Sequence, residues 1–227
     1  MFYSDHLMKG LILDLVDVLV DSMPVCYDPW NVASNEVVNV NIEVDERTIY
    51  LLEGMRGIEL VKNFFEFNTS ELEQFDESIA MQVTKRKDDL RKIFSFKPFE
   101  CVNELVTNLR YRKAVVIGTA KKDVESVLNQ ALGFGKVIIS PDRVMIGKPH
   151  AAWLFSAEGK LKLGTTESIV VENAPLGVEV VNKADIPCIV VFNNTPPDTE
   201  DFKSLITEQR ILKCTESAFN FLQAWCN

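Results

Sequence analysis

The chain contains a series of short apolar runs separated by longer segments with helical periodicity. Runs of four or five apolar residues without polar alternation are typical of strands that are buried on both faces of a parallel sheet. Helical spacing predicts helices between them, and one of these begins with proline, a common first helical residue. The alternation of strand and helix predicts a doubly wound, parallel, Rossmann-like α/β sheet. The predicted strands cover 11–15, 114–117, 137–139, 169–171 and 188–192, and the predicted helices cover 121–132, 150–157 and 175–183.

One long stretch interrupts this alternation. From position 23 to about 96, apolar residues recur at helical spacing, as between Gly57 and Phe65, and strand character is low. We therefore expect an α/β core formed by 1–22 and 97–227, and a small helical cap formed by 23–96. Ligands of open α/β sheets bind outside the carboxyl ends of the strands, so an insertion that leaves this edge would cover the site as a lid.

Composition and charge narrow the range of partners. The net charge of -9 disfavours binding to nucleic acid or to an acidic membrane surface, although local lysines can still attract a small anion. The five cysteines are scattered without metal-ligand spacing, and we expect reduced thiols. The first residues do not resemble a secretory signal, and no apolar run approaches the roughly 20 residues of a membrane span. These features predict a cytoplasmic protein and leave its oligomeric state open.

The first apolar run ends in an acidic loop. The segment from Leu13 to Ser22 resembles the first motif of the haloacid dehalogenase (HAD) superfamily, D-x-D-G-x-L-x-D-S, with Asp14 at its first position. Val16 stands where the motif has its second aspartate, and Asp17 stands where it has glycine, a position at which aspartate tolerates an unusual backbone conformation. A strand that simply ends in a polar loop would explain this segment alone equally well.

Three later segments follow the order and spacing of the same family. Thr119, or Gly118 if the alignment slips by one, follows the second predicted strand, where the family has a Thr or Ser. Lys148 lies in Ile-Gly-Lys-Pro, which resembles the third motif. Glu172 and Asn173 lie in a segment similar to the fourth motif, V-V-E-D-S-x-x-G-V, with Asn173 in the place of the aspartate. Each feature alone has a bland explanation, such as a helix cap or a solvated lysine.

The resemblance implies a definite chemistry for these positions. Asp14 would attack phosphorus and form an aspartyl-phosphate. Lys148 would neutralise the nucleophile and the phosphate, and Gly118, Thr119 and Lys148 would bind the phosphoryl group. Mg²⁺, which prefers oxygen ligands, would be bound by Asp14, the Val16 carbonyl, Glu172 and Asn173, more weakly than in the standard site because Asn173 is uncharged. Val16 would leave the acid and base step without its usual carboxylate.

The helical stretch resembles the cap of the β-phosphoglucomutase-like branch. The segment from Leu52 to Gly57 is similar to its substrate loop, and the segment from Lys85 to Lys87 is similar to a basic turn of its cap. Arg56 would then bind a second anionic group of the substrate through its planar guanidinium group. Solvated helix faces are an equally good explanation of both segments.

Two functions remain from the sequence. The first is a Mg²⁺-dependent phosphatase that hydrolyses a small phosphorylated metabolite through Asp14, with an impaired acid and base step. The second is a catalytically inactive protein of the same fold that binds a phosphorylated ligand or regulates a partner, because Val16 and Asn173 both change proton or metal chemistry. Dehalogenase and phosphonate-cleaving chemistries are less consistent with the residues near Gly54 and Glu172.

Overall fold

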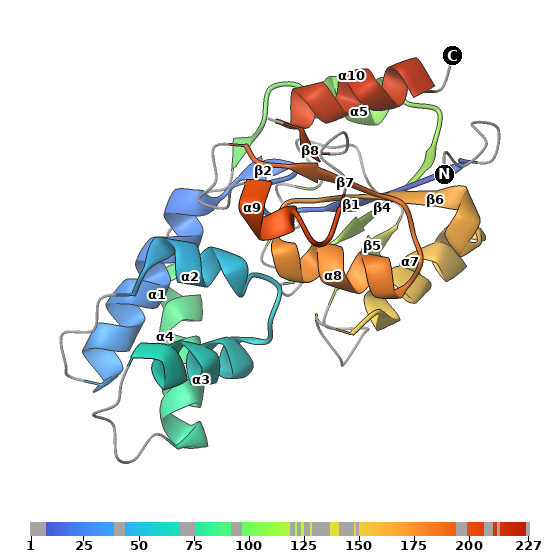
Figure 1. Cartoon of the computed structure of the whole chain (residues 1–227). Coiled ribbons are helices and arrows are strands. Elements are labelled where there is room, and N and C mark those ends of the chain that lie inside the picture. Colours follow the sequence, from blue (N-terminus) through green and yellow to red (C-terminus); the bar gives the residue numbers. More distant parts are fainter. Residues whose placement is uncertain are drawn as a thin grey trace.

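The computed structural model describes most of the chain and contains one large parallel sheet (Figure 1). The described residues are 8–38, 44–68, 76–91, 97–118, 137–140, 148, 150–193, 199–206, 211–212 and 214–225, together with 121, 124 and 128. The six strands are β1 (Gly10–Asp14), β4 (Arg112–Val116), β5 (Ile138–Ile139), β6 (Ser168–Glu172), β7 (Cys188–Val191) and β8 (Ile211–Leu212).

The strand order confirms the predicted fold class. The order is β5-β4-β1-β6-β7-β8, and every neighbouring pair is parallel. From β1 the chain continues to β4 and β5 on one side and then to β6, β7 and β8 on the other. The chain therefore changes direction at β1, and this change places the carboxyl ends of β4, β1 and β6 next to one another, the usual location of a ligand site in such sheets.

Alternate residues of each strand face two different layers of helices. In β1, Leu11 and Leu13 face one core, and Ile12 faces the other. The first core is closed by α5 (Val102–Asn108) and α10 (Thr215–Trp225), and the second by α7 (Ala152–Leu161), α8 (Pro175–Lys183) and α9 (Thr199–Phe202) (Figure 1). Burial on both faces explains why the strands are continuously apolar.

The predicted helices agree with the structure where it can be compared. Helix α8 has the predicted bounds, and α7 begins two residues later than predicted and extends to Leu161. Within the predicted helix 121–132, only 121, 124 and 128 are described, and each is helical. The strand β8 and the helices α5, α9 and α10 were not predicted.

Four helices occupy the stretch between β1 and β4. They are α1 (Met23–Val38), α2 (Glu46–Leu51), α3 (Gly57–Asn68) and α4 (Glu77–Arg91), and they share a core of their own that includes Trp30, Phe64 and Phe65. The chain leaves and re-enters the α/β part through a small antiparallel pair, β2 (Val20–Asp21) with β3 (Lys97–Pro98). Figure 1 shows these helices beside the carboxyl ends of the strands.

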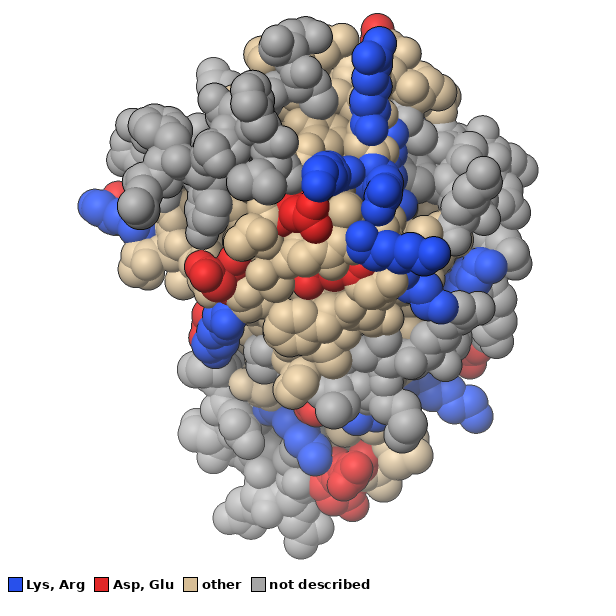
Figure 2. All heavy atoms as spheres, turned by 90° about the vertical axis from the view of Figure 1, so that its right-hand side faces the viewer, with Lys and Arg blue, Asp and Glu red and all other residues tan. Residues whose placement is uncertain are grey.

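Basic side chains lie on the side of the molecule where the strands begin, opposite to their carboxyl ends (Figure 2). Figure 2 views the molecule from that side, and lysines and arginines gather on it. Lys9 pairs with Glu167, and Arg112 donates to the Leu161 carbonyl at the end of α7, so these two cations take part in local structure. Within the described part of the chain, the helices are too short or too polar to cross a membrane.

Candidate active site

A buried lysine joins two carboxylates at the carboxyl ends of β1 and β6. Asp14 ends β1, Glu172 ends β6, and Lys148 reaches both. The Lys148 Nζ lies 3.3 Å from the Asp14 Oδ1 and forms a shorter contact with the Glu172 Oε1. All three side chains are buried. The structure therefore brings together residues that the sequence separates by more than 130 positions.

Local backbone fixes the Glu172 carboxylate. Its Oε2 accepts hydrogen bonds from the backbone N–H groups of Asn173 (2.9 Å) and Ala174 (3.2 Å), which precede α8. Gly177, in the first turn of α8, lies so close to this carboxylate that a Cβ atom would overlap with it. A glycine is therefore required at this position for α8 to pack against Glu172.

Burial and charge together determine the protonation of this group. Burial raises the pKa of Asp14 to about 7, the Lys148 ammonium opposes this increase, and the Glu172 carboxylate adds to it. Burial alone would lower the pKa of Lys148, but the Asp14 and Glu172 carboxylates raise it above its usual value. Lys148 is therefore a permanent cation, suited to neutralise an anion next to Asp14.

The loop after Asp14 turns sharply at Asp17, which has a left-handed φ of 51°. This matches the glycine-like backbone expected at that position. The Asp17 carboxylate accepts hydrogen bonds from the Ser22 N–H (2.9 Å) and hydroxyl (3.0 Å). Burial raises the pKa of Asp17 to about 6, and the bonds from Ser22 limit the increase. Val16 lines the cavity together with Asp14, and Asp17 does not, so Asp17 does not replace the second aspartate of the motif in the cavity lining.

Asn193 and Thr215, which follow β7 and β8, bind the backbone of the same loop. The Asn193 amide donates to the Asp17 carbonyl (2.6 Å), and the Thr215 hydroxyl donates to the Val18 carbonyl (2.5 Å). Asn193 and Thr215 also bond to each other. These contacts fix the loop on the side of the sheet that carries α10.

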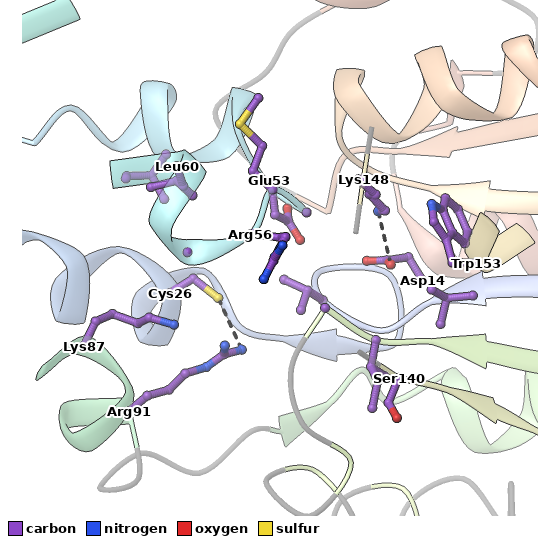
Figure 3. A pocket seen from close by; sticks show the side chains of 18 of the residues that line it. Asp14, Cys26, Glu53, Arg56, Leu60, Lys87, Arg91, Ser140, Lys148 and Trp153 are labelled. Atoms are coloured by element: carbon purple, nitrogen blue, oxygen red, sulfur yellow. Dashed lines mark hydrogen bonds and ion pairs between the residues drawn. The ribbon is translucent and has the colours of Figure 1, made fainter. Parts of the chain in front are cut away.

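A cavity of about 460 Å³ lies between the carboxyl edge of the sheet and the four helices (Figure 3). Apolar side chains such as Trp30, Ile49 and Leu60 line its helical side. Its charged lining residues are four cations and two carboxylates, a positive balance in a chain of net charge -9. These charged residues are Arg56, Lys87, Arg91 and Lys148, with Asp14 and Glu53.

Some of the residues predicted to bind substrate line this cavity. Gly118 and Arg56 line it. Thr119 lies outside the described residues. The basic segment from Lys85 to Lys87 lies inside α4. Only Lys87 of the three is buried, and its Nζ lies 4.6 Å from the centre of the Trp30 ring.

Two residues of the helical stretch join the site without having been predicted. The Asn173 amide donates to the Tyr50 hydroxyl (2.8 Å) and to the Glu53 carboxylate (2.9 Å). Burial, and then the negative charges of Asp17 and Asp14, raise the pKa of Glu53 well above its usual range. Glu53 directly precedes Gly54, whose φ of 91° and close packing on the Lys148 side chain both require glycine. Gly54 and the similarity of its segment to the substrate loop were the sequence signals of a close approach.

The donor set fits a divalent cation if amide and carbonyl oxygens contribute. Among the described residues, no three His, Cys, Asp or Glu side chains form a metal-binding group. Asp14 and Glu172 supply two carboxylates, and the buried Oδ1 of Asn173 has no hydrogen-bond partner within the described structure. An unpartnered buried amide oxygen, on the residue that follows Glu172, is a kind of ligand that Mg²⁺ binds.

Comparison with known proteins identifies the family. The family model described as haloacid dehalogenase-like hydrolase matches residues 11–191. A Haemophilus influenzae protein without an assigned function is 22% identical over 75% of this chain and 84% of its own. The chain therefore belongs to the haloacid dehalogenase-like hydrolase family, as the motifs predicted.

Solved structures show the same fold. A Bacteroides vulgatus protein assigned as a β-phosphoglucomutase has a TM-score of 0.82 at 19% identity, over 97% of this chain and 90% of that one. A predicted phosphoglycolate phosphatase from Haemophilus somnus has a TM-score of 0.73 at 17% identity, over 97% of this chain and 99% of that one. Helical insertion and α/β core are thus both part of the shared architecture.

Proposed function

We propose that this protein is a Mg²⁺-dependent phosphohydrolase that acts on a small phosphorylated metabolite through an aspartyl-phosphate at Asp14. The observation that carries the proposal is the contact of one buried lysine, Lys148, with both Asp14 and Glu172. A nucleophilic carboxylate must approach an anionic phosphate, and a fixed cation at that point removes most of the repulsion. The phosphatase among the structural relatives supports the same chemistry.

In this proposal each residue has a defined task. An Asp14 carboxylate oxygen bonds to phosphorus as the bond to the ester oxygen breaks, and water then hydrolyses the acyl-phosphate to release inorganic phosphate and restore Asp14. Gly118 and Thr119 bind the phosphoryl group together with Lys148. Asp14, Glu172, Asn173 and the Val16 carbonyl hold Mg²⁺, which supplies positive charge for the transferred phosphoryl group.

The cavity supports an anionic substrate of limited size. Arg56, Lys87 and Arg91 lie on the helical side, away from Asp14 (Figure 3). We propose that residues 23–96 act as a cap, that the ester group enters between cap and core, and that Arg56 binds a second anionic group of the substrate. Cytoplasmic metabolites with two acidic groups fit these features.

Val16 limits the range of substrates. A valine cannot donate a proton to the departing oxygen, and a general acid contributes roughly 10²–10⁴-fold to such a step. We expect acyl and nitrophenyl phosphates, whose leaving groups depart without a proton, to react much faster than sugar phosphates. Equal rates for the two classes would show that another group supplies the proton.

The test is an assay of the purified protein with Mg²⁺ on a panel of phosphorylated metabolites and on p-nitrophenyl phosphate. Phosphate release that is lost in Asp14→Asn and in the absence of Mg²⁺ is expected. Denaturing mass spectrometry of the wild type during turnover should show a phosphorylated chain, since hydrolysis of the intermediate also lacks its base. Activity that survives in Asp14→Asn would contradict the proposal.

The second candidate is a phosphate-ligand binding or regulatory protein without turnover. The observation that favours it is that Val16, which cannot donate or accept a proton through its side chain, lines the cavity together with Asp14. Calorimetry with the same panel distinguishes the two functions, because a binding protein retains affinity for its ligand while releasing no phosphate.

A further inference from the structure

The position after Glu172 is where the fourth motif departs from the family pattern, and the structure shows what the asparagine does there. Asn173 is fully buried. It has two amide hydrogens, and both are directed to the helical stretch: one reaches the Tyr50 hydroxyl at 2.8 Å and the other the Glu53 carboxylate at 2.9 Å. The side chain at position 173 therefore connects the core to the α2 region.

An aspartate could not donate these two hydrogen bonds. An ionised carboxylate has no hydrogen to donate, so the bond to Glu53 would be lost. It would also place a second carboxyl group directly against that of Glu53, and two buried carboxyl groups in contact cannot both be ionised. The amide is therefore the group that this packing of α2 requires.

Two further contacts make α2 a docking element. The Tyr50 hydroxyl hydrogen-bonds to Asp17 and, with Ser22, limits the increase that burial causes in the pKa of that carboxyl, so Tyr50 connects Asn173 to the loop that follows Asp14. One turn earlier, the Arg47 guanidinium lies 2.5 Å from the Asp201 carboxylate in α9. In the contact between the α2 region and the α/β part, Asn173 forms the buried hydrogen bonds, and Arg47 forms a more exposed ion pair.

We propose that Asn173 is a positioning residue that fastens the helical insertion over the catalytic edge of the sheet through Tyr50 and Glu53. Its Oδ1 has no partner within the described structure and is left for a cation, so one side chain serves the cap with its nitrogen and the metal site with its oxygen. The inference concerns the site proposed above, but its test requires no catalytic activity.

The experiment exchanges the donor and the acceptor between positions 173 and 53. Four proteins are compared: wild type, Asn173→Asp, Glu53→Gln and the double variant. Hydrogen exchange of the peptide covering 46–57 is followed by mass spectrometry with a metal chelator present, so that bound metal does not contribute. Asn182→Asp, the same change in α8 at an exposed side chain that donates to the Leu205 carbonyl, is the control.

In Asn173→Asp, exchange of 46–57 should become about tenfold faster, the equivalent of one charge-assisted hydrogen bond. Glu53→Gln alone should change little, because the amide oxygen that it introduces still accepts from Asn173. The double variant should return to within about threefold of wild type, because the amide introduced at position 53 can donate to the carboxylate introduced at position 173. A purely structural role of the two positions would give additive losses instead of this rescue.

Two results would overturn the proposal. One is exchange of 46–57 that is unchanged in Asn173→Asp, and the other is a double variant that exchanges as fast as that single variant. If Asn173→Asp does not fold, Tyr50→Phe, which removes only the hydroxyl, must still accelerate exchange of the same peptide. Failure of the phosphatase assay would leave these results unaffected, so the two proposals can fail separately.

Discussion

Gly177 decides how closely α8 approaches the Glu172 carboxylate. An added methyl group would overlap with that carboxylate, so Gly177→Ala should displace Glu172 and lower the free energy of unfolding by about 1–3 kcal/mol. Gly159 lies inside α7 and has open space around the position of a Cβ atom. Gly159→Ala is therefore the matched control, and it should raise the free energy of unfolding by up to about 1 kcal/mol. Urea unfolding of both variants measures the difference, and equal effects would contradict this account.

Val16 is a second position at which a single side chain should have a large effect, in this case on the rate of turnover. Val16→Asp places a carboxylate in the cavity beside Asp14, where it can protonate the departing oxygen and activate water. Turnover of sugar phosphates should rise by about 10²-fold or more. Single-turnover and steady-state kinetics, with Asp14→Asn as the inactive reference, measure this increase. A variant that folds and binds Mg²⁺ but turns over nothing would favour the binding-protein function.

Along helix α4, Lys87 and Arg91 line the cavity, whereas Lys85 and Arg86 are exposed to solvent. Lys87 is buried against the Trp30 ring, whereas Lys85, two residues earlier, is exposed. Lys87→Gln should raise the KM for phosphorylated substrates by about five- to tenfold, because it removes a desolvated cation from the binding cavity. Lys85→Gln makes the same change in charge on the same helix and should leave KM nearly unchanged. A similar KM in both variants would exclude Lys87 from substrate binding.

The sequence predicted the elements that carry the chemistry, because their patterns are local. The apolar runs that end at Asp14 and Glu172 are continuous and long enough to identify strands, and the lysine motif is specific. β8 has only two residues, and its pairing with β7 is visible only in three dimensions. The contacts of Asn173 with Tyr50 and Glu53 span about 120 positions, so no periodicity in the sequence could indicate them.

For the whole molecule, binding of Mg²⁺ at the proposed site should increase the stability of the folded chain. An ion that binds only the folded chain stabilises it by mass action, by about 2.7 kcal/mol at a hundred times its dissociation constant. Millimolar Mg²⁺ should therefore raise the melting temperature of the wild type and not that of Glu172→Gln. Sodium chloride at equal ionic strength is the control, since screening alone would raise both equally. An equal response of the two proteins to Mg²⁺ would argue against this site.

The central position of β1 also has a consequence for how the chain reaches its native state. Its two neighbours, β4 and β6, begin about 100 and 158 positions later. Closing such long loops is costly in entropy and slow, whereas the contacts among α1, α3 and α4 span shorter distances along the chain. We expect the helices around Trp30 to become ordered in refolding before the surroundings of Trp153 do. Asp14 and Lys148 would then meet after these helices are ordered, so partly folded chains would not contain the assembled site.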